Sequence, residues 1–201
     1  ITDRKVNTDQ YTSFVGANNY EIGLAAGNYA ANYLPPNAII LEIWGLTQTS
    51  PAQERHKGFV DALREREDLS FRKIEGQWLV DTARMELRKL EHPEQIDFVY
   101  AHNDMMAIAA REYFMAWDSI RGRELRIIGV DAVAGAGLEA VEDGRINASF
   151  LYPTGGEQVI RTAMRIIQGE PVDKFIPLRT APVDSSVCPH LIVASGPTPE
   201  I

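Results

Sequence analysis

Short apolar runs alternate with amphipathic stretches along most of this chain, and this alternation constrains the fold more than any other feature. Runs rich in Ile, Val, Leu and Phe lie near residues 38–45, 71–77, 96–101, 125–130 and 146–151. Stretches with apolar residues three or four positions apart lie near 19–33, 52–66, 80–91, 104–117, 136–143 and 156–168. Strands that alternate with helices are typical of a parallel sheet. The sequence therefore predicts an α/β fold, in which a doubly wound parallel sheet carries helices on both faces.

Composition and charge exclude several classes of protein. Apolar residues make up 45% of the chain and charged residues 24%, as in an average globular domain. The formal net charge of −8 opposes a phosphate backbone, so we expect no nucleic acid partner. Apolar stretches such as 38–46 are about half as long as a membrane-spanning helix, so we expect no direct insertion of this segment into a bilayer. The single cysteine, Cys188, excludes an internal disulfide bond.

Polar and aromatic side chains follow the predicted strands and also stand in the opening segment of the chain. These side chains belong to Asp3, Arg4, Trp78, Asn103, Asp104 and Asp131. Because ligands of an open parallel sheet bind beyond the carboxyl ends of its strands, we expect these groups to lie at one edge of the sheet. Carboxylate, amide and guanidinium groups can each bind adjacent sugar hydroxyls, and an indole ring can pack on the C–H face of a sugar. This set of side chains favours a monosaccharide ligand.

Each of these residues also has a structural interpretation. Asn103 and Asp104 are favoured caps of the helix that follows them. Asp131 is equally typical of a turn, and Trp78 of a core position. We expect His102, beside a helix start, to be packed in the interior rather than to bind a ligand.

Catalytic motifs are scarce in this sequence. It contains no P-loop, no G-x-S-x-G motif and no pair of histidines at metal-binding spacing. Residues 135–140, GAGLEA, match the dinucleotide-binding pattern G-x-G-x-x-A, but residues 131–134 separate them from the preceding strand. We therefore expect a binding module rather than an enzyme, with no catalytic residue, no cofactor and no metal ion.

Six segments carry a resemblance to a known family. In chain order they are ITDRKV, FVGANNYEIGLAAGNYAANYL, PAQERHKGF, VYAHNDMMAIAA, IIGVDAVAGAGLEAVEDGRINASF and EQVIRTAMRIIQGEPV. They resemble the ribose/galactose-type periplasmic sugar-binding proteins, whose type I periplasmic-binding fold is shared with the effector domains of Lac-repressor-like regulators. The resemblance implies two doubly wound lobes, joined by three crossovers, that close on a sugar in the cleft between them.

The resemblance also implies a set of ligand-binding residues. They are Asp3, Arg4, Arg55, Trp78, Asn103 and Asp131. Asp3 and Arg4 match an Asp-Arg pair that holds sugar hydroxyls from the first lobe. Trp78 matches the aromatic residue that stacks on the sugar ring, and Asn103 and Asp131 match the hydroxyl-binding amide and carboxylate of the second lobe.

Arg55 matches the cleft arginine of the ER…GF motif in this family. Taken alone, it would be a solvated arginine on the helix surface, paired with Glu54 or Asp61. Leu151 stands where ribose binders often carry a glutamine. This departure argues against ribose itself and leaves ketoses such as fructose open, and we expect a pentose or a ketohexose.

The resemblance divides the chain into parts of two lobes. We expect residues 1–7 to be a remnant of the first lobe and 8–151 to form the second, sugar-binding lobe. Residues 152–182 would supply a helix and a strand that return to the first lobe, and 183–201 a closing strand and a linker. Family members begin with several βα units that are absent here. The returning helix would then expose an apolar face, and we expect weak sugar binding, or binding through a second copy in a homodimer.

The segment LEIWGLTQTSPAQERHKGF resembles the periplasmic sensor regions of hybrid two-component regulators from gut Bacteroidetes. This resemblance implies a periplasmic domain that senses a monosaccharide for a signalling histidine kinase, and we interpret the chain as a piece of a longer protein. Two alternatives stay open. In the first, the chain is the substrate-binding protein of a sugar ABC transporter. In the second, it is the effector domain of a Lac-repressor-type transcription regulator.

Overall fold

The computed structural model describes residues 1–6, 8–121 and 125–187, and Cys188 lies outside them. The strands are β1 (Phe14–Ala17), β2 (Ile39–Trp44), β3 (Ser70–Glu75), β4 (Phe98–Ala101), β5 (Arg126–Ile128), β6 (Ala148–Phe150), β7 (Phe175–Leu178) and β8 (Pro182–Asp184). The helices are α1 (Asn19–Ala31), α2 (Ser50–Ala62), α3 (Val80–Leu87), α4 (Asp104–Arg121), α5 (Gly137–Glu142) and α6 (Gly156–Ile167), with a 3-10 turn at Pro93–Gln95.

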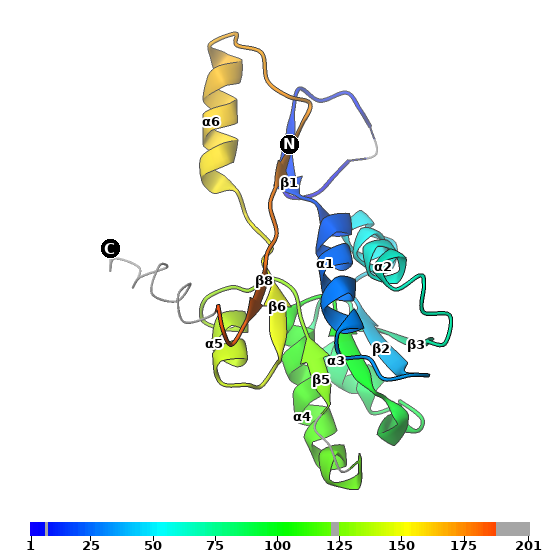
Figure 1. Cartoon of the computed structure of the whole chain (residues 1–201). Coiled ribbons are helices and arrows are strands. Elements are labelled where there is room, and N and C mark those ends of the chain that lie inside the picture. The colour runs from blue at the N-terminus through cyan, green and yellow to red at the C-terminus, as the bar shows by residue number, and fades with distance from the viewer. Residues whose placement is uncertain (7, 122–124, 188–201) are drawn as a thin grey trace.

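The strands form a six-stranded sheet and a separate two-stranded sheet (Figure 1). The larger sheet has the order β3-β2-β4-β5-β6-β8, with parallel pairing from β3 to β6. β8 pairs with β6 in the antiparallel sense and forms one edge, as the proline-rich sequence around it allows. The smaller sheet pairs β1 with β7 in parallel. The α/β fold with a mostly parallel sheet is therefore confirmed.

Helices cover both faces of the larger sheet, as predicted. Ile40 and Phe98 belong to a core cluster that also contains side chains of α1 and α2. Their neighbours Leu41 and Val99 belong to a second cluster, with side chains of α3, α4 and α5. Because successive residues of a strand point to opposite faces of the sheet, the sheet separates the two clusters.

The start of the chain differs from the sequence-based expectation. Thr2 forms a parallel bridge to Val15, which lies in a segment where no strand was predicted. The regular strand is β1, which the sequence pattern did not reveal. Its four residues directly precede Asn18, the residue whose side chain caps α1, so the strand is too short to separate from the helical pattern that follows.

α1 and α2 pack against each other at glycines. A Cβ atom on Gly23 would overlap the carbonyl oxygen of Arg55, and a Cβ atom on Gly58 would overlap that of Tyr20. Glycine at both positions therefore lets the two helix backbones approach closely. This approach brings Asn19, at the start of α1, within hydrogen-bonding distance of Arg55.

α6 lies beside the two-stranded sheet, away from the larger sheet (Figure 1). One side of this helix carries Ile160, Met164 and Ile167, and their exposed fractions are 66%, 50% and 78%. These side chains form an apolar stripe with no covering element among the described residues. Within the same residues, no helix has the length and apolar character required to cross a membrane.

Candidate functional site

A cleft of about 200 Å³ lies where the carboxyl ends of β3 to β6 meet the start of α2. The residues that line it are Asp3, Arg4, Pro51, Arg55, Trp78, Asn103, Asp131 and Tyr152. The structure therefore brings together all six ligand-binding residues that the family resemblance implies, whereas Asp104, also expected at this edge, is buried and does not line the cleft. The cleft is smaller than the roughly 300–1,000 Å³ typical of sites for drug-sized ligands, so it suits a small molecule.

Arg55 lies at the bottom of the cleft with only 3% of its surface exposed. Its Nε donates a hydrogen bond to Oδ1 of Asn19 at 2.9 Å, and its Nη1 donates to the carbonyl oxygen of His102. The guanidinium carbon lies 5.3 Å from the ring centroid of Trp78 and 5.1 Å from that of Tyr152, within the range of cation–π attraction. The guanidinium group is thus fixed from several sides.

The alternative interpretation of Arg55, as a solvated surface arginine, is wrong. Glu54 accepts instead from Lys5 at 2.7 Å, and Asp61 from Lys57 at 2.5 Å. Sequence spacing places these carboxylates near Arg55 along the helix, but the packing of α1 on α2 turns the arginine inward.

Asn103 both caps a helix and faces the cleft. Its Oδ1 accepts from the backbone N–H of Met106 at 2.9 Å, so the capping interpretation is confirmed. Its Nδ2 donates to the carbonyl oxygen of Trp78 at 3.1 Å. An amide has two donor hydrogens and two acceptor lone pairs, so the cap and the contact to Trp78 leave one of each for a ligand.

Trp78 is partly buried and packs against the core cluster of α3 and α4 while it lines the cleft. Its indole lies against Gly45, where a Cβ atom would overlap the ring. The backbone at Gln77 and Trp78 has φ values of 55° and 68°, in the left-handed region. Such backbone conformations cost free energy and persist only where the surrounding structure imposes them.

Asp131 also has an unusual backbone, with φ of 124°, and Ala132 follows with φ of 50°. Asp131 forms a parallel bridge with Leu151 rather than a turn. Burial raises the pKa of Asp131 to about 6, and the guanidinium of Arg55 opposes this shift. The N–H of Ala132 donates to Oδ2 of Asp104 at 2.8 Å, which helps to hold this backbone in place.

Asp3 and Arg4 lie at the rim of the cleft, and their side chains are more than half exposed. Oδ1 of Asp3 accepts from the hydroxyl of Tyr152 at 2.8 Å. Sequence reasoning missed Tyr152, although it follows β6 as Asn103 follows β4, so the same rule identifies it. Pro51 was also missed, because a proline in a first helical turn is a common structural feature.

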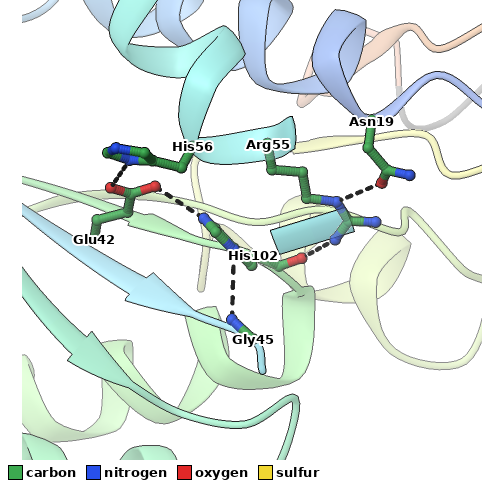
Figure 2. A network of polar contacts seen from close by, with 6 residues as sticks. All are labelled: Asn19, Glu42, Gly45, Arg55, His56 and His102. Carbon is green, nitrogen blue, oxygen red and sulfur yellow. Dashed lines mark hydrogen bonds and ion pairs between the residues drawn. The ribbon is translucent and has the colours of Figure 1, made fainter. Parts of the chain in front are cut away.

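His102 is fully buried and does not line the cleft, as expected. Its ring lies between Glu42 and the backbone of Gly45, and its carbonyl oxygen contacts Arg55 (Figure 2). This network was not predicted, because Glu42 lies in the middle of an apolar run.

The chain is similar to known proteins in both sequence and structure. Residues 1–171 match the family model described as a periplasmic binding protein domain. The ribose import binding protein RbsB of Escherichia coli (strain K12) is 27% identical over 185 residues, which are 88% of this chain and 59% of that protein. A D-ribose/D-allose-binding protein of Pseudomonas aeruginosa is 28% identical over 78% of this chain and 49% of its own length.

Two solved structures are similar over nearly the whole chain. The fructose binding periplasmic domain of hybrid two component system BT1754 matches with a TM-score of 0.87 and 36% identity. The matched region covers 97% of this chain and 66% of the chain of that domain. A Mycobacterium smegmatis protein in complex with beta-D-fucofuranose has a TM-score of 0.83 and 26% identity, over 96% of this chain and 66% of its own. The chain thus spans less than two thirds of the length of these proteins.

Proposed function

Because this chain belongs to the periplasmic binding protein domain family, we propose that it binds a monosaccharide in the cleft around Arg55. The observation that carries the proposal is the convergence of guanidinium, amide, carboxylate and indole groups on one small cleft. The lining side chains of this cleft carry several hydrogen-bonding groups and include no serine, cysteine or histidine. This set of groups favours binding over catalysis.

Each group has a distinct part in the proposed binding. Arg55 has N–H donors beyond those it uses within the protein, and its fixed position limits the entropy lost when a sugar binds. The Asn103 amide can donate and accept a hydrogen bond, the Asp131 carboxylate can accept hydrogen bonds from sugar hydroxyls, and the Trp78 ring offers an apolar surface to the sugar C–H groups. A sugar with a misplaced hydroxyl would leave a buried polar group unpaired, which is the proposed basis of selectivity.

We propose a pentose or a ketohexose as the ligand. The names of these relatives mention ribose, which is a pentose, and fructose, which is a ketohexose, besides the aldohexose allose. Leu151 stands where the family resemblance implies a glutamine in ribose binders, and its side chain packs against the core cluster of α3, α4 and α5 rather than lining the cleft.

We also propose a revised division of the chain into lobes. The sequence-based boundary at residue 8 assigns β1 to the second lobe, yet β1 pairs with β7, which lies in the returning segment 152–182. The proposed remnant of the first lobe therefore comprises residues up to Ala17 together with α6 and β7. The larger sheet, with the antiparallel β8 at its edge, is the proposed second lobe.

For the cellular role, we propose a periplasmic sensor domain of a signalling histidine kinase. The similarity to the BT1754 domain, at 36% identity, supports this role. The matches to ribose import binding proteins support the second candidate, a binding protein of a sugar ABC transporter. The sequence that follows Ile201 in the gene distinguishes them, because a sensor requires a membrane segment and a kinase domain there.

Calorimetry with D-fructose, D-ribose and D-allose tests the binding proposal. We expect weak, saturable binding of at least one sugar, and a loss on the order of 1–3 kcal/mol of binding free energy in Asn103→Ala and in Asp131→Ala. Asp143→Ala, which removes an exposed carboxylate outside the cleft, is the control and should bind normally. Unchanged affinity in both cleft variants would remove these residues from the site, and sub-micromolar affinity would contradict the proposed lobe division.

A further inference from the structure

Glu42 is a buried carboxylate that lies outside the cleft and bridges two histidines (Figure 2). It lies in β2, opposite Tyr100 of β4, with 2% of its surface exposed. Its Oε1 lies 2.9 Å from Nε2 of His102, and its Oε2 lies 2.8 Å from Nδ1 of His56. Both carboxylate oxygens therefore have a partner.

The surroundings fix the proton of His102. The backbone N–H of Gly45 points at Nδ1 of this ring at 3.4 Å, so Nδ1 is the acceptor and Nε2 carries the hydrogen that Glu42 accepts. Burial lowers the pKa of His102 and so favours the neutral ring. Although burial raises the pKa of Glu42, the hydrogen bonds from His102 and His56 outweigh it and hold the pKa at about 2.

Each histidine on Glu42 is the chain neighbour of a residue that lines the cleft. His56 follows Arg55 on α2, and His102 precedes Asn103 at the junction of β4 and α4. The carbonyl oxygen of His102 also accepts a hydrogen bond from Nη1 of Arg55. A single carboxylate therefore connects the two chain segments that carry the arginine and the amide of the cleft.

We infer that Glu42 is a positioning residue, which fixes Arg55 and Asn103 relative to each other by binding both histidines. Burying a carboxylate between two imidazoles is an expensive way to fill a core position, since an apolar side chain would satisfy packing alone. The arrangement is explained if the exact placement of the neighbouring cleft groups matters. The effect on sugar binding rests on the proposed function, whereas the effect on Arg55 does not.

Proton NMR of the ¹⁵N-labelled full chain tests this inference without a ligand. The readout is the exchange rate of the Arg55 Nε–H, which is buried and donates to Asn19 in the wild type. In Glu42→Leu we expect this exchange to become faster by about tenfold, because the His102 carbonyl that helps to hold Arg55 loses its support. Glu42→Gln keeps an oxygen for His102 and should retain slow exchange.

Two further variants keep the test decisive. Glu42→Asp keeps the charge but is too short to reach both histidines, so it should accelerate Arg55 exchange even if Glu42→Leu does not fold. Leu87→Ala, in the core contributed by α3, serves as a control for general loss of stability. It should lower the melting temperature without a selective effect on Arg55. If Glu42→Asp and any folded Glu42→Leu lower the melting temperature but leave Arg55 exchange as in Leu87→Ala, the inference is wrong.

Titration with D-fructose then connects positioning to binding. We expect about tenfold weaker binding by Glu42→Asp and near wild-type binding by Glu42→Gln. If the wild type binds none of the sugars, the proposed function fails while the Arg55 exchange measurement still decides the role of Glu42. Accelerated Arg55 exchange together with unchanged sugar affinity would restrict that role to the free protein and overturn its part in binding.

Discussion

At the scale of single residues, several cleft side chains have a structural and a proposed binding role at once. Asn103 caps α4 and still has hydrogen-bonding capacity toward the cleft. Trp78 packs on the core and on Gly45 while its ring lines the cleft. These structural contacts hold the side chains in position before a ligand arrives, which reduces the entropy cost of binding.

The pH dependence of stability provides a prediction for Asp104, which supports the backbone at Ala132. Burial raises the pKa of Asp104 to about 7, and hydrogen bonds from Ser149 and Ala132 oppose the shift. Below about pH 4 this carboxyl is protonated in both the folded and the unfolded states. As the pH rises toward 7, the unfolded chain ionises first, so the stability contributed by the protonated group is progressively lost.

Asp104→Asn removes this titration. We therefore expect the free energy of unfolding of the wild type to fall relative to the variant between about pH 4 and pH 7, by an amount on the order of 2–4 kcal/mol. Urea denaturation across this range measures the difference, and the exposed Asp143→Asn is the control. Parallel pH profiles for wild type and Asp104→Asn would contradict the prediction.

The sequence could identify cleft residues that follow strands, because chain position alone places them at one edge of the sheet. It left the burial of Arg55 open, since burial depends on how α1 packs on α2. The sequence also could not identify the bridge from Glu42 to His56 and His102, because these two histidines lie 14 and 60 residues from Glu42 along the chain. Long-range side-chain contacts of this kind are set by the three-dimensional packing.

At the scale of elements, the close packing of α1 on α2 determines where the cleft arginine lies. Gly23→Ala places a methyl group against the carbonyl of Arg55, so the helices must separate. We expect a loss on the order of 1–3 kcal/mol in the free energy of unfolding, together with weaker sugar binding. Gly156→Ala, where a Cβ atom meets nothing within 4 Å, should be nearly neutral. Equal stability of the two variants in urea denaturation would refute this packing argument.

Helices and strands with a clear apolar period were predictable within a few residues. β1 was not, because the strand with which it pairs, β7, lies more than 150 residues away along the chain. Helix ends also shifted: α2 begins at Ser50, where Pro51 fits the first turn, and α4 continues to Arg121.

At the scale of the whole molecule, the apolar stripe of α6 lies uncovered among the residues that the structure describes. Ile160, Met164 and Ile167 expose large side chains on a helix that stands away from the larger sheet. Surfaces of this kind drive association. We propose that this chain, studied alone, self-associates through the stripe.

Sedimentation analysis over a range of protein concentrations tests this proposal. We expect concentration-dependent association of the wild type and a clear shift toward monomer in Ile160→Glu and in Ile167→Glu. Arg161→Gln changes the polar side of the same helix and should leave association unchanged. A wild type that stays monomeric at every concentration would count against the stripe as a contact surface.

The account depends above all on a sugar that enters the cleft and contacts Trp78. The indole N–H signals of the three tryptophans, followed by NMR during addition of D-fructose, D-ribose or D-allose, test this most directly. We predict that at least one sugar shifts the Trp78 signal saturably, while the signal of Trp117, which lies in α4 and does not line the cleft, stays in place. If no sugar moves the Trp78 signal, or if Trp117 moves equally, the cleft is not a monosaccharide site.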